Sequence, residues 1–298
     1  MIRRFNRLVS LASSVVDITA FVDALPMPGG DTLASSSMVA VGGSFNVESA
    51  AARLGLPVVH AGSSGEGPNT RMLRDALAAE GIVDVGRKYG DDDLGICITM
   101  VEPSGERTFV TTQGAESRLD IGHLKSLKVL PTDAVYLSGY DLVYEGSKHA
   151  LATWLQEGHL DGAALFFDPG PLVDQIDHDV LEWIRREAFL ITCNEAEFEF
   201  LKPRLDDRAL FARRIGAQGC ELYECAERRQ SIAAEQANAI DTTGAGDVHT
   251  GALIAFLAEG RSWAEALMLA NRAAAFCVEH RGGASGPTRS QIEIDLAK

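Results

Sequence analysis

The sequence lacks several features that would place it in a common class. It contains no run of eighteen apolar residues, so no segment is long enough to span a membrane as a helix. Its five cysteines are an odd number without the paired spacing of zinc ligands, which argues against a disulfide framework and favours a reducing, cytoplasmic compartment. Basic residues are also scarce: 27 Lys and Arg face 42 Asp and Glu, giving a formal charge of −15. This balance excludes a general nucleic-acid binder.

The best-known nucleotide-binding signatures are missing as well. The sequence contains neither the G-x-x-x-x-G-K-[ST] loop nor the motifs of protein kinases. No G-x-G-x-x-G turn follows the apolar stretch that ends at Val16, which argues against a dinucleotide-dependent dehydrogenase. If so acidic a chain binds a nucleotide, local N–H groups, a metal ion and a few arginines must overcome its overall field.

What is present is a large apolar content and an alternation of strand-like and helix-like segments. With 298 residues and 46% apolar content, the chain can form one large α/β domain over residues 1–298 with an elaboration, or two domains. The alternation is typical of βαβ units and a parallel sheet. The expected strands cover residues 8–16, 58–62, 133–139, 163–170 and 189–193, and the expected helices cover 42–54, 69–80, 147–156, 179–187 and 262–279.

Two segments interrupt this rhythm. Weak strands near residues 18–23 and 32–41, together with a hairpin over 94–112, predict a small sheet beside the main domain that could act as a lid. Residues 202–239 are hard to interpret, because Arg213 and Arg214 obscure the strand that should precede Gly216.

The stretch Asp241-Thr-Thr-Gly-Ala-Gly-Asp247 suggests an anion site. A tight turn at Gly244, Ala245 and Gly246 leads into an apolar helix, whose first N–H groups and dipole favour an anion. Asp247, in the first helical turn, could accept a proton from a hydroxyl that attacks phosphorus. Taken alone, the stretch fits a simple turn with a favourable first-turn charge equally well.

Further polar groups stand at helix starts and strand ends. Asp17 follows the first expected strand, where it is either a substrate ligand or a solvated acid. The pair Gly42-Gly43 allows close backbone approach, and Asn46 one turn later offers a donor and an acceptor to a sugar hydroxyl. Asn194 and Glu197 are three residues apart in an expected first helical turn. They could face a metal-bound phosphate, although locally a helix cap is favoured.

In their order and spacing, these motifs resemble those of the PfkB/ribokinase family of carbohydrate and nucleoside kinases, over essentially the whole chain. The most specific element is D-T-x-G-A-G-D, and the glycine pair with its asparagine is the second. The resemblance implies a three-layer α/β/α core with a mostly parallel central sheet and a small β-sheet lid.

The resemblance also implies roles for individual residues. Asp247 would be the general base, and the N–H groups of Gly244, Ala245 and Gly246 would form the anion hole. The sugar would be held by Asp17, Gly42, Gly43 and Asn46. ATP would be held by Asn194, Glu197, Gly216, Gly219, Thr243, Gly244, Gly246 and Asn271, with Glu197 acting on Mg²⁺ through water or phosphate. A monovalent cation such as K⁺ would lie near Asp241, Gly283 and Ala284.

The sequence departs from the family pattern at three places. His249 stands where a large apolar residue is usual, and we interpret it as a packing variant rather than a second base. Arg213 and Arg214 replace an apolar strand, and Glu48 stands where small residues are frequent.

Together the motifs predict an ATP- and Mg²⁺-dependent kinase acting on a hydroxyl, expected to be primary, of a sugar or sugar-like molecule. A nucleoside kinase and a non-catalytic sugar or nucleotide sensor are the alternatives. Exposed edges of the lid sheet would allow a homodimer.

Overall fold

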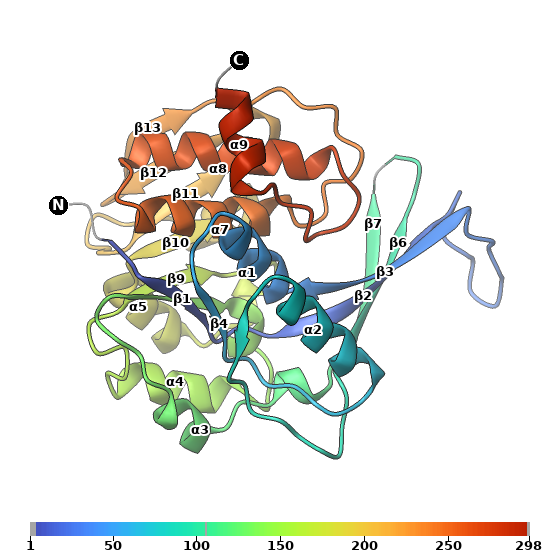
Figure 1. The fold of residues 1–298 in the computed structure, drawn as a ribbon, viewed down its shortest axis with the longest axis horizontal. Coiled ribbons are helices and arrows are strands. Elements are labelled where there is room, and N and C mark those ends of the chain that lie inside the picture. The colour runs from blue at the N-terminus through green and yellow to red at the C-terminus, as the bar shows by residue number, and fades with distance from the viewer. Residues whose placement is uncertain (1–3, 105, 297–298) are drawn as a thin grey trace.

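The computed structural model describes residues 4–104 and 106–296, with side chains to residue 293, and these residues form two β-sheets with helices around the larger one (Figure 1). The larger sheet has the strand order β13-β12-β11-β10-β9-β8-β1-β4-β5. Its strands pair in parallel from β5 to β11, and antiparallel at the β12–β13 edge. Their bounds are β1 Arg7–Ser10, β4 Val58–His60, β5 Val83–Asp84, β8 Asp133–Ser138, β9 Ala164–Asp168, β10 Leu190–Cys193, β11 Leu210–Arg214, β12 Cys220–Glu224 and β13 Glu227–Ile232.

Alternation along the central strands divides the core into two apolar clusters. In β9, Ala164 and Phe166 pack with α1, α2, α7 and α8, whereas Leu165 and Phe167 pack with α3, α4, α5 and α6. Strands buried on both faces in this way need helices on each side. The helices are α1 Ser44–Arg53, α2 Pro68–Ala79, α3 Ile121–Ser126, α4 Lys148–Gln156, α5 His178–Glu187, α6 Glu195–Leu201, α7 Ala245–Ala258, α8 Trp263–Val278 and α9 Arg289–Leu296. The expected three-layer architecture with a mostly parallel sheet is confirmed. None of the helices within the described residues is long and apolar enough to cross a membrane.

The smaller sheet has the order β3-β2-β6-β7 and projects from one side of the molecule (Figure 1). Its strands are β2 Ser14–Phe21, β3 Ser36–Gly43, β6 Ile96–Val101 and β7 Arg107–Thr112. The expected weak strands and the 94–112 hairpin therefore form a single sheet. Gly105, in the expected hairpin turn, lies outside the described residues.

The prediction of one continuous first strand over residues 8–16 is wrong. The chain leaves the large sheet after β1 and enters the small sheet at Ser14. Between the two strands, the Ala12 carbonyl accepts from the Ser44 hydroxyl and the Ser13 carbonyl accepts from the Ser44 N–H, both at 2.9 Å. These bonds replace a sheet ladder at the break. As a result, Asp17 lies inside β2 of the small sheet and not at the end of a core strand.

The asparagine cap expected for the helix over 69–80 is also wrong. Helix α2 begins at Pro68, a residue favoured in the first helical position, and Asn69 lies inside the helix. The carboxylate of Asp93 caps this end from a distance, accepting from the N–H groups of Asn69 and Thr70 at 2.9 and 2.8 Å. A cap supplied 23 residues later in the chain leaves no local signal. In contrast, the predicted capping box of Ser262 and Glu265 at α8 is present.

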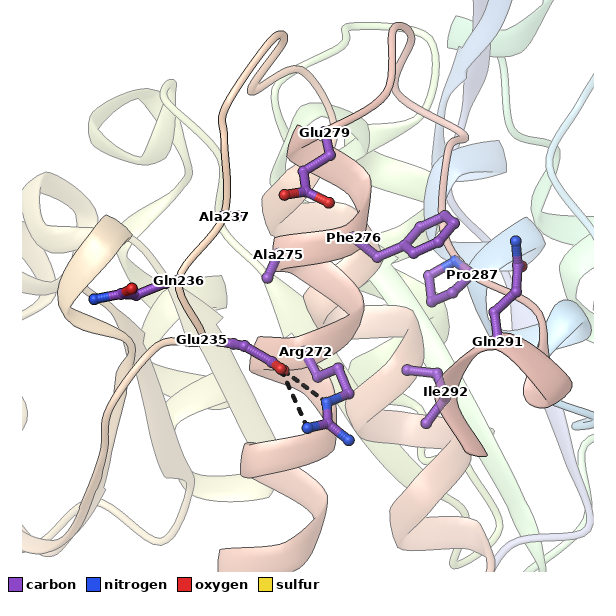
Figure 2. A pocket seen from close by; sticks show the side chains of 10 residues that line it. All are labelled: Glu235, Gln236, Ala237, Arg272, Ala275, Phe276, Glu279, Pro287, Gln291 and Ile292. Atoms are coloured by element: carbon purple, nitrogen blue, oxygen red, sulfur yellow. Dashed lines mark hydrogen bonds and ion pairs between the residues drawn. The ribbon is translucent and has the colours of Figure 1, made fainter. Parts of the chain in front are cut away.

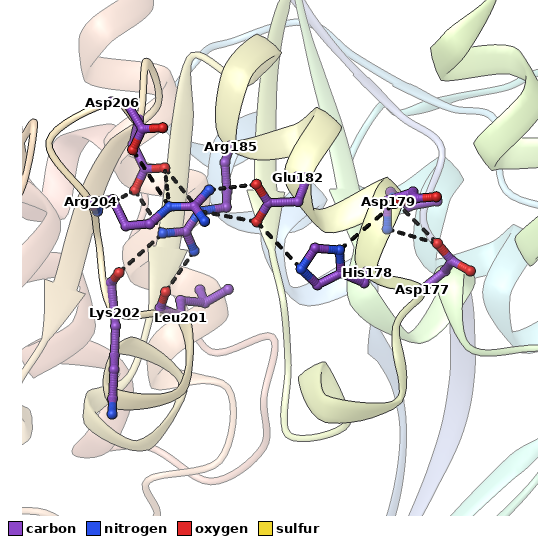
Figure 3. A network of polar contacts seen from close by, with 11 residues as sticks. Asp177, His178, Asp179, Glu182, Arg185, Leu201, Lys202, Arg204 and Asp206 are labelled. Atoms are coloured by element: carbon purple, nitrogen blue, oxygen red, sulfur yellow. Dashed lines mark hydrogen bonds and ion pairs between the residues drawn. The ribbon is translucent and has the colours of Figure 1, made fainter.

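The region that the sequence left unclear begins with a loop fixed by a buried arginine. Arg185 of α5 donates to both carboxylate oxygens of Asp207, at 2.9 and 2.8 Å. It also donates to the carbonyls of Leu201 and Lys202 (Figure 3). This pairing satisfies a charge that would otherwise be costly to bury. The next strand is β11, which contains both Arg213 and Arg214, so the two arginines do not interrupt the sheet.

Candidate active site

The glycine turn before α7 has the geometry expected of an anion site. Gly244 is the N-cap with φ 71°, in the left-handed region, and a Cβ built on it would lie 2.3 Å from the Gly283 carbonyl oxygen. Only glycine fits there without movement of the backbone. Within the described structure, the N–H groups of Gly244 and Gly246 have no protein acceptor, whereas that of Ala245 makes a long 3.4 Å bond to the Thr242 carbonyl. At least two of the three predicted amides are thus available to a ligand.

Asp247 is half-buried in the first turn of α7, and Asn46 of α1 donates to its Oδ2 at 2.9 Å. Close packing of the two helices makes this contact possible: a Cβ on Gly251 would lie 2.3 Å from the Val47 carbonyl oxygen. Burial raises the pKa of Asp247 to about 6, against the opposing effect of the Asn46 hydrogen bond. The carboxylate therefore changes protonation state near physiological pH.

Asp17 reaches the same place from the small sheet. Its side chain lies over the backbone of Gly42, because a Cβ on Gly42 would fall 1.9 Å from Asp17 Oδ2. Burial, with a further contribution from the charge of Asp247, raises the pKa of Asp17 to about 7. Gly43 ends β3 as the N-cap of α1 with φ 67°. The predicted substrate residues Asp17, Gly42, Gly43 and Asn46 therefore gather beside the predicted base.

A cavity of about 470 Å³ opens on the other side of the glycine turn. Its lining includes these residues predicted for the nucleotide: Asn194, Gly216, Gly219, Gly246 and Asn271. A second, smaller cleft of about 90 Å³ lies across α8, where Arg272 is paired with Glu235 (Figure 2). It holds none of the predicted site residues. The larger cavity borders the glycine turn, with Thr242, Ala245 and Gly246 in its wall.

Asn194 and Glu197 form a reciprocal capping box at the start of α6. The Asn194 side chain accepts from the Glu197 N–H at 2.9 Å, and the Glu197 carboxylate accepts from the Asn194 N–H and side-chain amide, both at 2.8 Å. The local interpretation as a helix cap is therefore correct. Burial raises the pKa of Glu197 to about 7. With both oxygens occupied, Glu197 fits a role toward Mg²⁺ through water or phosphate better than direct ligation. No group of three or more metal-ligating side chains occurs in the described part of the chain.

The region predicted for a monovalent cation holds an arginine. Arg107 of β7 donates to Asp241 Oδ1 at 3.3 Å and to the Thr242 hydroxyl at 2.6 Å, which ties the small sheet to the glycine turn. The same carboxylate accepts from the N–H groups of Thr243 and Gly282. The carbonyl of Ala284 accepts from Arg53 at 2.8 Å. Oδ1 of Asp241 thus accepts two hydrogen bonds, while Oδ2 and the Ala284 carbonyl accept one each, and the monovalent cation stays a prediction.

The sequence interpretation missed an ion pair at the site. Asp168 ends β9 and Arg214 ends β11, and Arg214 Nη1 donates to Asp168 Oδ2 at 3.0 Å. Position at the carboxyl end of a parallel strand was the signal that could have revealed Asp168, as it did Asn194. His249 is buried in the wall of the 470 Å³ cavity, and burial together with the charge of Arg214 lowers its pKa to about 3. It is a neutral imidazole, consistent with its interpretation as something other than a second base.

Comparison with known proteins decides the family. The profile described as "pfkB family carbohydrate kinase" matches residues 6–289. The chain belongs to the pfkB family of carbohydrate kinases. An uncharacterized sugar kinase of Escherichia coli (strain K12), YegV, is 33% identical to this pfkB chain over 298 residues, covering 95% of this chain and 91% of that protein.

Solved structures share the fold of this pfkB kinase. A ribokinase from Cryptococcus neoformans var. grubii serotype A, solved with ADP, has a TM-score of 0.82 at 21% identity and covers 98% of this chain and 100% of its own. A nucleoside kinase from Burkholderia thailandensis, solved with inosine, has a TM-score of 0.80 at 20% identity, with coverages of 97% and 95%. The ribokinase-like fold and the expected class of carbohydrate kinase are confirmed.

Proposed function

We propose that this kinase transfers the γ-phosphoryl group of ATP to a hydroxyl, expected to be primary, of a small sugar or sugar-like molecule, with Asp247 as general base. The observation that carries the proposal is the place of Asp247, which contacts Asn46 on one side and stands beside the free N–H groups of Gly244 and Gly246 on the other. A hydroxyl bound there is adjacent to both a proton acceptor and an anion site.

In this mechanism, the Asp247 carboxylate accepts the hydroxyl proton as the hydroxyl oxygen forms a bond to the γ-phosphorus. The bond between that phosphorus and the β–γ bridging oxygen breaks, and its electron pair leaves with ADP. The N–H groups of Gly244 and Gly246 stabilise charge on the transferred group. A single donor of this kind is worth on the order of 3 kcal/mol in the transition state.

The neighbouring residues would position the two substrates. Asp17 and Asn46 can accept from and donate to sugar hydroxyls, while Gly42 and Gly43 allow the sugar to approach the backbone. The cavity bounded by Gly216, Gly219 and Asn271 would hold the nucleotide, with Thr243 beside its phosphates. Mg²⁺ would neutralise phosphate charge, held through water or phosphate near Glu197.

The small sheet would act as a lid that excludes water from the transfer. The contacts from Arg107 to the loop before Gly244 support this, because they connect the sheet to the anion site. A homodimer through the lid, a single domain and a cytoplasmic location stay predictions.

Two alternatives remain open at this site. A nucleoside is the alternative acceptor, because solved nucleoside kinases share this fold with ribokinases. A non-catalytic sensor would need neither the carboxylate of Asp247 nor the free amides, so their presence argues against it.

Release of ADP tests the proposal across these alternatives. Pentoses, hexoses and nucleosides are screened with ATP and Mg²⁺, and we expect one acceptor class to raise ADP release at least tenfold above the rate with ATP alone. No acceleration by any compound, together with measurable binding of a sugar, would favour the sensor instead. ATP hydrolysis that ran as fast without acceptor as with it would contradict the lid.

The acid limb of the pH profile follows from the raised pKa of Asp247. Asp247 can accept a proton only when ionised, and its pKa is raised to about 6. We therefore expect kcat/KM to fall about tenfold per pH unit below about pH 6, with the fall beginning nearer pH 7 because the pKa values of Asp17 and Glu197 are raised to about 7. Initial rates between pH 4.5 and 8.5 at limiting acceptor check this. A limb centred near pH 4, the ordinary value of an aspartate, would contradict it.

A further inference from the structure

Arg214 lies between Asp168 and the first turn of α7, which contains Gly246. Its Nη1 donates to Asp168 Oδ2 and to the Thr250 hydroxyl, both at 3.0 Å. These bonds hold one edge of the guanidinium. The other edge faces the glycine turn: a Cβ built on Gly246 would lie 3.3 Å from Arg214 Nε and 3.6 Å from Nη2. The described structure gives that edge no hydrogen bond, only Glu197 Oε2 at 3.9 Å from Nη2.

The same arginine lines the nucleotide cavity. It belongs to the wall of the 470 Å³ space together with Gly246 and His249. Within the described structure neither buried ring nitrogen of His249 makes a hydrogen bond of good geometry, although Asn271 lies near the ring. Polar side chains left unpaired at a cavity wall are suited to a polar ligand. Arg214 and Gly246, whose N–H has no protein acceptor within the described residues, line the same space.

Acidic side chains surround Arg214. The carboxylates of Asp168, Glu197 and Asp247 all lie close enough to interact with its charge, in a chain with a formal charge of −15. Nearby carboxylates keep the pKa of Arg214 above its usual value despite burial, so the side chain stays charged. A guanidinium presents a fixed fork of donors that matches a phosphate. Pairing with Asp168 uses only part of that fork.

We propose that Arg214 binds the terminal phosphate of the nucleotide and remains on the transferred phosphoryl group, with Asp168 and Thr250 holding the guanidinium in place. The inference rests on the proposed function, since it assumes ATP in this cavity. It adds a positively charged catalytic residue that the motifs did not identify. The competing role is purely structural, in which Arg214 only neutralises Asp168 and Glu197.

Nucleotide affinities of Arg214→Gln separate these roles. Dissociation constants for ATP, ADP and AMP are measured by calorimetry with Mg²⁺, and kcat is measured with the best acceptor. We expect the ATP constant to rise about 10- to 100-fold, as for a lost hydrogen bond to a charged group, while the AMP constant stays within twofold. We also expect kcat to fall by at least tenfold.

Arg213→Gln is the matched control. Arg213 precedes Arg214 on β11, but it is paired with Glu195 and Glu221 and does not line the cavity. This variant should keep the wild-type ratio of ATP to AMP affinity. Loss of an ion pair on this strand should not by itself change the ratio of ATP to AMP affinity. A changed ratio in Arg214→Gln therefore indicates contact with the terminal phosphate.

The outcomes distinguish the two proposals. If the Arg214→Gln variant folds and keeps both the wild-type ratio of ATP to AMP affinity and the wild-type kcat, the proposed role of Arg214 is wrong. The proposed function still holds in that case, provided that the wild-type protein turns over ATP. A wild-type protein that neither binds ATP nor releases ADP overturns the proposed function itself. If Arg214→Gln does not fold, it is combined with Asp168→Asn, which removes both charges of the ion pair. The ratio of ATP to AMP affinity of this double variant is then compared with that of Asp168→Asn alone.

Discussion

Replacement of Asp247 by Asn is expected to lower kcat by about 10²- to 10⁴-fold, the usual contribution of a general base. Asparagine keeps the size of the side chain and an oxygen that can accept from Asn46. It removes only the capacity to take a proton. Because burial already disfavours the charged carboxylate, as its raised pKa indicates, the neutral amide should fold at least as stably as the wild type.

Steady-state ADP release and ATP binding measure this effect separately. The dissociation constant for ATP should change only a few-fold, because the base contacts the acceptor and not the nucleotide. Glu265→Gln is the control: it also removes a first-turn carboxylate, but from the capping box of α8, away from the site. Turnover of the Asp247→Asn variant within threefold of the wild type would exclude Asp247 as the base.

The glycine motifs were the part of the site most accessible from sequence. Gly43, Gly219 and Gly244 all have positive φ angles, of 67°, 104° and 71°, which other residues rarely adopt. A glycine beside polar residues therefore marks a backbone requirement directly. The helix that follows Gly244 and the two-faced apolar strands of the core were legible for a similar reason, since burial dictates their composition.

Contacts between distant segments could not be predicted in the same way. Asn46 and Asp247 are 201 residues apart, and Arg214 and Asp168 are 46 apart. Their pairing depends on the strand order, in which β1 lies between β8 and β4, and no local pattern reveals that order. The chain's departure from the large sheet after Ser10 was hidden because the strands on both sides of it are apolar.

The role of Arg214 was missed because the residue was interpreted only from its neighbours in the sequence. In the sequence, two arginines appeared to interrupt a strand that should be apolar. In the structure, the strand is intact, and the side chains of Arg213 and Arg214 pair with different acids on opposite sides of it. The charge is there because the strand ends at a site rich in carboxylates.

Replacement of Gly244 by Ala should have the second large effect, a fall in kcat of about 10²- to 10³-fold. The new Cβ would meet the Gly283 backbone at 2.3 Å, and the φ of 71° is unfavourable for any side chain. The turn must therefore move. Such a movement reorients the free N–H groups of Gly244 and Gly246, on which the stabilisation of the transferred phosphoryl group would depend.

Gly260→Ala serves as a control on the same helix, because Gly260 follows the far end of α7 with φ 81°. Its new Cβ would meet only the flexible side chain of Arg4, so it should cost about 1–2 kcal/mol of stability without altering kcat. Thermal unfolding and steady-state rates of both variants are compared. If Gly244→Ala and Gly260→Ala lost similar stability and both kept wild-type kcat, the amides of the turn would not be the anion hole. A fall in kcat confined to Gly244→Ala would instead locate the charge that develops during transfer at the N-terminus of α7.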